Sequence, residues 1–175
     1  MSCLVNDMLF LAKSDIQSEA TPMMSANLTD IFMNSILTFE AVVYEKNIQL
    51  DSDLADNLIV KGSEQQFAQL CNILLDNACK YTDENGHIQA TLSKQNGFVH
   101  LLVNNSGAPI PSEQLPYLFD RFYRADEART RKKSGYGLGL SIAARIAEIH
   151  HGKIEVTSSA DDGTTFHVSI PEYHE

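Results

Sequence analysis

The sequence predicts an α+β fold, a two-layer α/β sandwich in which one mixed β-sheet is covered by helices on one face. Runs that alternate apolar and polar residues, as strands do, come in adjacent pairs. Helical stretches stand before and between these pairs instead of alternating with single strands, which argues against a doubly wound sheet. The 175 residues, 43% of them hydrophobic, suffice for one globular domain with its own core.

The elements are expected in the following order. Residues 1 to about 20 form an amphipathic helix that begins without a capping signal, as though cut from a longer helix, and Pro22 ends it. A second amphipathic helix is expected near residues 28–46. Next come strands over residues 48–53 and 57–61, a helix starting at the capping box of residues 63–66, and a hairpin of residues 87–94 and 98–104. A short helix capped by Ser112 and a mobile loop over residues 121–136 follow. The chain then forms a helix over residues 138–150, closed by Gly152, and strands over residues 153–158 and 164–170.

Composition excludes several classes of function. The formal net charge of −10, with no offsetting basic stripe, argues against a nucleic-acid partner. The cysteines are odd in number and stand in apolar helical surroundings, so we expect reduced core thiols in a cytosolic compartment rather than a disulfide framework: Cys3, Cys71 and Cys79. No apolar run is long enough to cross a bilayer and no signal peptide is visible, so the chain as given is expected to be soluble.

The most informative segment is the helical run of residues 72–82. Helical periodicity places Asn77, Lys80 and Tyr81 on one face of its last turn. An amide oxygen can bind a hard cation, an ammonium can pair with phosphate, and a phenol ring can lie beside a base. This combination favours a nucleotide site.

Two further segments carry polar or glycine-rich signals. Residues 135–141 contain three glycines just before a helix, where free backbone N–H groups and the helix dipole can hold an anion; a flexible loop with a helix cap is the alternative. The dinucleotide fingerprint is excluded because Leu140 stands where its third glycine would be, and the P-loop sequence is absent. Residues 104–111 follow an apolar strand, and an amide oxygen there could accept from an exocyclic amine; the alternative is a polar turn.

Taken together, the segments resemble the ATP-binding catalytic domain of sensor histidine kinases, in the superfamily that also holds gyrase, Hsp90 and MutL. The resemblance covers about residues 27–171 and consists of an N box (residues 72–82), a first glycine box (105–111), an F box (118–124), a second glycine box (135–140) and a final motif (163–166), in the family's order. It implies a Bergerat-type ATP-binding fold over residues 27–175. Residues 1–22 are similar to the end of the second helix of the family's dimerisation domain. The amino-acid sequences of this helix and of the F box are most similar to those of heavy-metal (copper/silver) sensor kinases.

The resemblance also implies roles for individual residues. At the metal and adenine edge, Asn77 would bind Mg²⁺, Lys80 would pair with phosphate, and Tyr81 would lie against adenine. The adenine pocket would further comprise Asn105 as acceptor, Gly107 giving room, Thr164 acting through a water, and Ile110 and Leu140 on the two faces of the base. The phosphates would be wrapped by Gly135, Tyr136, Gly137, Leu138 and Gly139. Arg124 and Arg129 would act on the γ-phosphate within a loop that orders on binding; a surface ion pair is the alternative for Arg124.

Two positions depart from the family pattern. The first glycine box normally opens with aspartate, and Asn105 can still accept the adenine bond but without charge assistance. The N box normally has a second asparagine four residues before Asn77, where this chain has Ile73. Asn72 stands five residues before Asn77, about 140° around the helix, so we expect it to point away from the cation as a solvated amide.

The implied function is binding of Mg²⁺-ATP and presentation of the γ-phosphate to a histidine on the dimerisation domain. None of the six histidines has the family's acceptor context, so the chain alone should not autophosphorylate; His150 and His151 are expected to complement a helix dipole rather than bind a metal. Expected partners are the protein's own dimerisation domain and a response regulator. We expect a monomeric chain, the cytoplasmic domain of a homodimeric inner-membrane protein. The alternatives are a degenerate regulatory module, marked by Asn105 and Ile73, and an anti-sigma-factor kinase, against which the first helix argues.

Overall fold

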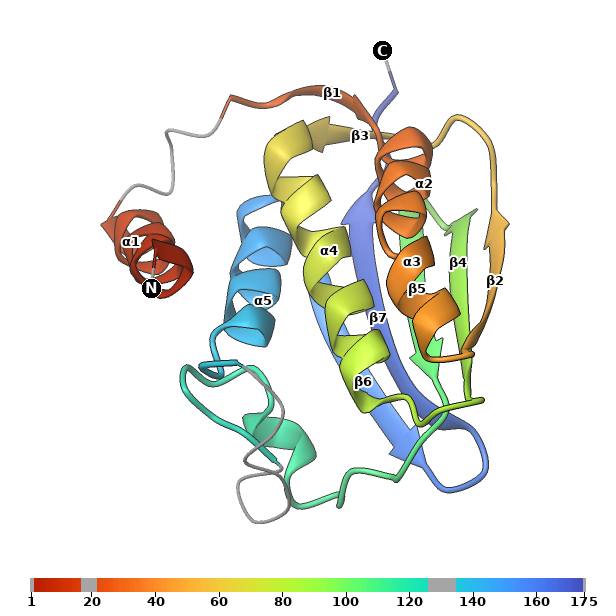
Figure 1. Cartoon of the computed structure of the whole chain (residues 1–175). Coiled ribbons are helices and arrows are strands. Elements are labelled where there is room, and N and C mark those ends of the chain that lie inside the picture. Colours follow the sequence, from red (N-terminus) through yellow and green to blue (C-terminus); the bar gives the residue numbers. More distant parts are fainter. Residues whose placement is uncertain (1, 17–21, 126–134, 175) are drawn as a thin grey trace.

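The computed structural model describes residues 2–16, 22–125 and 135–174 and confirms the predicted α+β sandwich. One five-stranded sheet carries α2, α3, α4 and α5 on one face, and α1 lies outside them against α5 (Figure 1). The elements are α1 (Ser2–Ile16), β1 (Met24–Asn27), α2 (Leu28–Thr38), α3 (Glu40–Glu45), β2 (Gln49–Leu54), β3 (Ile59–Gly62), α4 (Glu64–Tyr81), β4 (His87–Gln95), β5 (Phe98–Asn105), the 3₁₀ helix η1 (Leu115–Tyr117), α5 (Gly139–Ile149), β6 (Lys153–Ser159) and β7 (Gly163–Pro171).

The sheet is mixed, as predicted, with strand order β2-β4-β5-β7-β6. Only the β2–β4 pair is parallel among these; the β4–β5, β5–β7 and β6–β7 pairs are antiparallel. Alternate residues of the central strands face the helices and are fully buried, including Ile88 and Ala90 on β4 and Val99 and Leu101 on β5. The helix-facing side of the sheet is therefore the core side, and strand ends at its margins are free to carry polar groups.

The central helix α4 is positioned by local and tertiary signals that agree. The Ser63 hydroxyl accepts from the Gln66 N–H at 3.3 Å, which confirms the Ser63 half of the predicted capping box, and the Ser63 N–H donates to Nε2 of His150. Phe67, Leu70 and Leu74 on one stripe of the helix are buried completely or nearly so, each contributing about 1.5–3 kcal/mol by removal from water. The C-terminal turn of α4 is thereby held at one edge of the sheet.

Three local expectations were wrong. The helix expected near residues 28–46 is two helices, because Phe39 separates α2 from α3. Strand β1 was not predicted; it pairs with β3 in a separate two-stranded antiparallel sheet. Ser112 caps no helix, because η1 begins after Gln114 and has no side-chain cap.

The C-terminal end of α5 also differs from expectation. The left-handed residue after the helix is His151 (φ 58°), not Gly152. A Cβ on Gly152 would lie 2.2 Å from the carbonyl oxygen of Ser169, so glycine is needed there for close approach of two backbones. His150 is buried: its Nδ1 donates to the Ile146 carbonyl at 2.7 Å, and its Nε2 accepts from the Ser63 N–H at 3.2 Å.

His150 therefore acts as a neutral link between the end of α5 and the start of α4, and not as a charge on the helix dipole. Its ring also packs on Phe67, with centroids 4.2 Å apart. Burial lowers the pKa of His150 below its ordinary value of 6.5, the nearby His151 lowers this pKa further, and the bond to Ile146 opposes both. Protonation would remove the lone pair that accepts from Ser63.

Replacing His150 by phenylalanine should lower the free energy of unfolding at pH 8 by about 1–3 kcal/mol, because the Ser63 N–H loses its partner. Because the folded-state pKa is depressed, the stabilisation by His150 is present above about pH 6.5 and is lost as the pH falls through the folded-state pKa. The difference in unfolding free energy between wild type and variant should therefore shrink below pH 6.5. Urea unfolding at several pH values checks this, and a difference that stays constant with pH would contradict it.

The cysteines with described side chains are free, as expected. Burial raises the pKa of Cys71 to about 12, and burial also raises the pKa of Cys79, opposed by the neighbouring Lys46. The reactive thiolate form is thus disfavoured at both positions. Across the described residues, the structure contains no helix with both the length and the apolarity to span a bilayer.

Candidate functional site

The last turn of α4 contains Asn77, Lys80 and Tyr81 of the N box. Asn77 is partly buried and Tyr81 is 37% exposed. Lys80 pairs with Asp76 one turn earlier at 2.7 Å, and both side chains are partly exposed, so the pair is worth about 1 kcal/mol at most. The Lys80 ammonium can therefore exchange this carboxylate for another anion at little cost.

Asn72 and Ile73, the residues five and four before Asn77, occupy different surroundings. Asn72 is exposed, whereas Ile73 is partly buried and packs against the core. A Cβ built on Gly139 would lie 3.5 Å from Cγ2 of Ile73, so Ile73 faces the start of α5. Asn77 consequently has no asparagine one turn before it.

The end of β5 lies directly beside α4. Asn105 is 4% exposed and its Nδ2 donates to the Ser106 carbonyl at 3.0 Å. Gly107 has φ +144°, and a Cβ there would lie 2.6 Å from the carbonyl oxygen of Tyr81. The first glycine box therefore packs on the last turn of α4 only because residue 107 has no side chain.

Thr164 and Ile110 are held next to Asn105 through Ser158. Thr164 is the strand partner of Asn105 in the β5–β7 pair. The Ile110 N–H donates to the Ser158 hydroxyl at 2.9 Å, and this hydroxyl lies 2.8 Å from the Thr164 hydroxyl. Ser158 was not among the residues predicted from the sequence. Its signal is a polar residue in phase with Ile154 and Val156 on the helix-facing side of β6.

The second glycine box leads into α5. Gly135 and Gly137 have positive φ of 152° and 73°, and Leu138 is the 2%-exposed residue that precedes the helix. The Ser141 hydroxyl bonds back to the Leu138 carbonyl at 2.7 Å. The N-cap residue is Leu138, which has no side-chain acceptor, so no side chain caps the first N–H groups of α5. Of the other expected residues in this segment, Tyr136 is 55% exposed, and Gly139 and Leu140 are partly buried.

This glycine segment lies against both the N box and the F box. A Cβ on Gly135 would lie 4.0 Å from the Lys80 ammonium nitrogen. The Gly137 carbonyl accepts from the Phe122 N–H at 2.9 Å, and the Gly135 carbonyl accepts from Nη1 of Arg124 at 3.2 Å. Arg124 is thus placed beside the segment predicted to wrap phosphates, while Arg129 lies outside the described residues.

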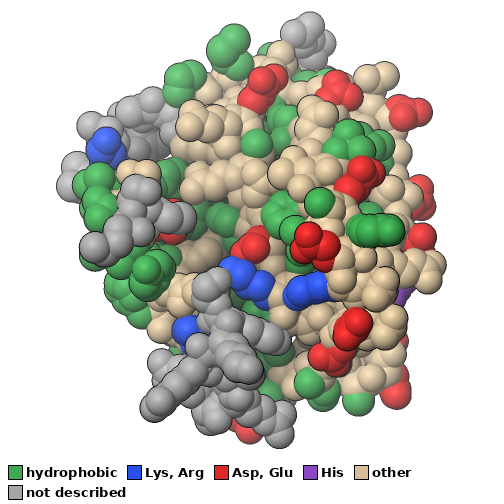
Figure 2. Space-filling view, in the orientation of Figure 1, with side chains coloured by type: hydrophobic (Ala, Val, Ile, Leu, Met, Phe, Trp, Pro, Cys, Tyr) green, Lys and Arg blue, Asp and Glu red, His purple; other side chains and the backbone are tan. Residues whose placement is uncertain are grey.

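Both cationic and anionic side chains lie around this region. Figure 2 shows a few Lys and Arg side chains near the middle of this face, with Asp and Glu side chains beside them. Lys46 donates from Nζ to the Cys79 carbonyl at 2.5 Å and so holds the last turn of α4. This lysine was not among the residues predicted from the sequence. It lines an open depression of about 400 Å³ together with Lys80, Thr82 and three carboxylates, Glu45, Asp83 and Glu84. No local pattern in the sequence marks Lys46, because its partner is 33 residues away.

The residues of the site fit a nucleotide, and the oxygens of the nucleotide would supply part of the coordination of its cation. The glycine positions leave room where side chains would collide, and the N–H groups at the start of α5, which no described side chain caps, suit an anion. Among the described residues, no cluster of three or more His, Cys, Asp or Glu could hold a metal ion. A hard cation at Asn77 would therefore take most of its ligands from phosphate and water, which is typical of Mg²⁺.

Comparison with known proteins identifies the fold and the family. The family model for "Histidine kinase-, DNA gyrase B-, and HSP90-like ATPase" matches residues 62–174. The chain is 40% identical over 172 residues to "Sensor histidine kinase YkoH" of Bacillus subtilis and 38% identical over 176 residues to "Probable sensor kinase SilS" of Salmonella typhimurium. These alignments cover 98% of this chain but only 37% and 35% of the relatives, so the chain spans about a third of their length.

Solved structures agree with this assignment. The nucleotide-free catalytic domain of histidine kinase ThkA superposes with a TM-score of 0.75 at 31% identity, over 86% of this chain and 95% of that domain. ThkA in complex with the response regulator protein TrrA superposes with a TM-score of 0.76 at 26% identity, over 98% of this chain and 49% of that one. Since the family model covers well over half of the residues, the chain belongs to the family of histidine kinase-, DNA gyrase B- and HSP90-like ATPases.

Proposed function

We propose that the chain is the ATP-binding catalytic part of a sensor histidine kinase. The convergence of the end of α4, the end of β5 and the glycine segment before α5 on one site carries this proposal. These are the segments expected to hold cation, adenine and phosphates. The similarity to YkoH and to the ThkA catalytic domain supports the same function.

The described residues would divide the work of binding as follows. Asn77 would offer its amide oxygen to Mg²⁺, and Lys80 would turn from Asp76 to a phosphate oxygen. Asn105, fixed by its bond to Ser106, would accept from the adenine amine. Bound ATP supplies the phosphoryl group, and the protein contributes positioning and charge neutralisation.

The remaining site residues would enclose the ligand. Ile110 and Leu140 would cover the faces of the base with Tyr81 at its edge, and Gly107 and Thr164 would complete the pocket. The backbone from Gly135 to Gly139 would wrap the phosphates, and Arg124, beside Gly135, would act on the γ-phosphate together with Arg129.

The wider protein is also a matter of proposal. Residues 1–22 would be the end of a dimerisation-domain helix and residues 27–175 the catalytic domain. The acceptor histidine and the homodimer contacts would belong to that dimerisation domain, in a membrane-held protein whose catalytic part is cytoplasmic. The ThkA–TrrA complex supports a response regulator as partner. The proposal of heavy-metal sensing rests only on the amino-acid sequences of the first helix and the F box.

Neither alternative function is favoured by a specific observation. The glycine boxes keep the conformations that leave room for a ligand, so the degenerate module has no structural support among the described residues. The relatives named above are called sensor kinases, which gives no support to an anti-sigma-factor kinase.

Calorimetric titration tests the proposal directly. The chain should bind ADP and a non-hydrolysable ATP analogue, more tightly in millimolar Mg²⁺ than in excess chelator. With labelled ATP the chain alone should remain unlabelled, and a separately produced dimerisation domain should acquire acid-labile phosphate on its histidine. Absence of binding heat at every Mg²⁺ concentration would exclude the proposal.

A further inference from the structure

Two histidines lie next to each other on the face of the sheet opposite the helices, which we call the open face (Figure 1). His100 on β5 alternates with Val99 and Leu101, which face the helices, and it lies diagonally across from His167 on β7. The ring centroids are 5.1 Å apart, and Nδ1 of His100 lies 2.8 Å from Nε2 of His167. Both residues are partly buried, so these two inner nitrogens are partly shielded from solvent.

The outer nitrogen of each ring faces an oxygen that accepts hydrogen bonds. Nε2 of His100 lies 3.4 Å from the Gln95 carbonyl oxygen, and Nδ1 of His167 lies 3.9 Å from Oε2 of Glu155. These oxygens favour the tautomers in which both outer nitrogens carry the proton. A neutral imidazole has one proton on its nitrogens, so the two inner nitrogens are then both left with lone pairs.

Two lone pairs that face each other at 2.8 Å repel unless a cation lies between them. A proton is one such cation, and the pair would then carry a positive charge. Burial lowers the pKa of His167 below its ordinary value of 6.5, and the nearby His100 lowers it further, while Glu155 raises it and Lys153 lowers it. The extra proton is therefore held weakly at neutral pH, and a metal ion can take its place.

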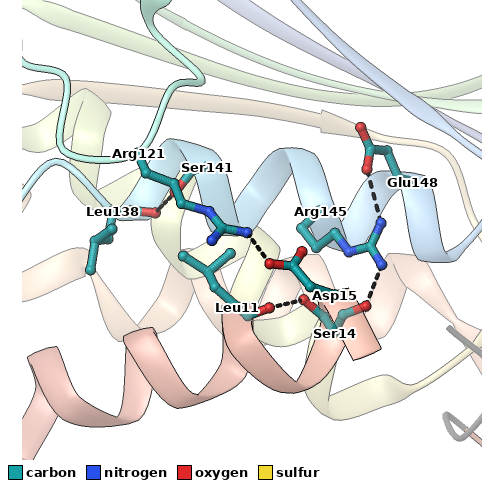
Figure 3. A network of polar contacts seen from close by, with 8 residues as sticks. All are labelled: Leu11, Ser14, Asp15, Arg121, Leu138, Ser141, Arg145 and Glu148. Atoms are coloured by element: carbon teal, nitrogen blue, oxygen red, sulfur yellow. Dashed lines mark hydrogen bonds and ion pairs between the residues drawn. The ribbon is translucent and has the colours of Figure 1, made fainter. Parts of the chain in front are cut away.

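The polar contacts between α1, the F box and α5 show the ordinary arrangement for comparison. There Arg121 donates to Asp15 at 2.6 Å, and Arg145 donates to Glu148 at 3.2 Å (Figure 3). Each of these donors meets an acceptor, so the contacts are complete without an added ion. The histidine pair differs because it has acceptors at both ends and lone pairs in the middle.

The distance between the inner nitrogens fits a tetragonal transition-metal ion. Imidazole nitrogens bind such ions at about 2.0 Å, so two of them at a right angle are about 2.8 Å apart, whereas on a tetrahedral ion they are about 3.3 Å apart. The inner nitrogens are 2.8 Å apart before any ion binds. Cu²⁺ and Ni²⁺ are the ions that prefer tetragonal nitrogen and oxygen sites. Because the ion would lie to one side of the line between the nitrogens, each ring would have to tilt toward it.

We propose that His100 and His167 together bind one tetragonal transition-metal ion, Cu²⁺ or Ni²⁺, on the open face of the sheet. The ion joins the two inner nitrogens, and water fills its remaining positions. Gln95 and Glu155 hold the rings through their outer N–H groups, as the outer partners of metal-bound histidines commonly do.

This site is separate from the nucleotide site. His100 stands five residues before Asn105 on β5, about 17 Å along the strand, and the alternation of the strand places the two on opposite faces. Lys153 pairs with Glu155 at 3.2 Å and reduces the attraction of the open face for a cation. With two protein ligands and this lysine nearby, the site is weak and its ion exchangeable.

Calorimetric titration of the whole chain with Ni²⁺ tests the site, because thiols reduce Cu²⁺ but not Ni²⁺. Wild type should bind one ion that His100→Gln and His167→Gln each bind at least about tenfold more weakly, since loss of even an outer partner of a metal-bound histidine costs that much. His87→Gln is the matched control. His87 also lies near a carboxylate, that of Asp51 at 3.7 Å, but among the described residues it faces no second imidazole, so this variant should keep the site.

NMR of the wild type gives a readout that does not depend on how the variants fold. Less than one equivalent of paramagnetic Ni²⁺ should broaden the imidazole resonances of His100 and His167 before those of the other histidines. Broadening that begins at another histidine would overturn the proposal. Two calorimetric results would do the same: variants at both positions that bind Ni²⁺ like wild type, or a loss of affinity in His87→Gln as large as in His100→Gln.

Discussion

Replacing Asn77 by alanine is expected to lower transfer of phosphate to an added dimerisation domain by about a hundredfold or more, the scale seen when one preorganised electrostatic contact is removed. Asn77 is the partly buried side-chain amide of the N box, and Ile73 one turn before it offers no oxygen. Without Asn77, the described part of the N box retains no side-chain amide on the last turn of α4. The affinity for nucleotide should fall mainly in the presence of Mg²⁺, because the lost interaction is with the cation.

Asn72→Ala is the matched control, because it removes the same group from an exposed position on the same helix. It should leave both transfer rate and Mg²⁺ dependence within about twofold of wild type, since surface changes of this kind are nearly neutral. Transfer rates at saturating ATP and calorimetric affinities with and without Mg²⁺ are the measurements. Equal effects of Asn72→Ala and Asn77→Ala would remove Asn77 from its proposed role.

Local signals allowed most of the fold to be predicted. Three features depend on residues close together in the sequence and could therefore be predicted from it: the cap at Ser63, the turn between β4 and β5, and the spacing of apolar residues in α4. The expected site residues are likewise grouped in short motifs, and the structure brings the described ones to one edge of the sheet. Their individual roles stay predictions.

Contacts between distant residues could not be predicted. The β1–β3 pairing, the Ser63–His150 bond and the Arg121–Asp15 ion pair join residues far apart in sequence. Each depends on packing that no single segment specifies. His150 shows the consequence: the helix end was predicted, but burial against Phe67 changed the residue from a charged group into a neutral link.

Replacing Gly163 by alanine is expected to destabilise the protein by about 2–5 kcal/mol and to weaken nucleotide binding at the same time. Gly163 has φ +74°, which costs an alanine about 1–2 kcal/mol. The added Cβ would lie 2.2 Å from the Asn105 carbonyl oxygen and 3.2 Å from Cα of Ser106. These are backbone atoms at the end of β5, so relief of the clash must move the first glycine box, at a further cost of about 1–3 kcal/mol.

Gly97→Ala separates the two causes. Gly97 has nearly the same φ, +79°, in the turn between β4 and β5, but no atom lies within 4 Å of its added Cβ. It should therefore show only the backbone cost of about 1–2 kcal/mol and normal nucleotide affinity. Urea unfolding and ADP titration of both variants give the comparison. If Gly163→Ala cost no more than Gly97→Ala, the close approach to Asn105 would not be what requires glycine. If it were less stable but bound ADP normally, the position of Asn105 would not control the adenine pocket, and the acceptor for the base would have to be sought elsewhere on the edge of the sheet.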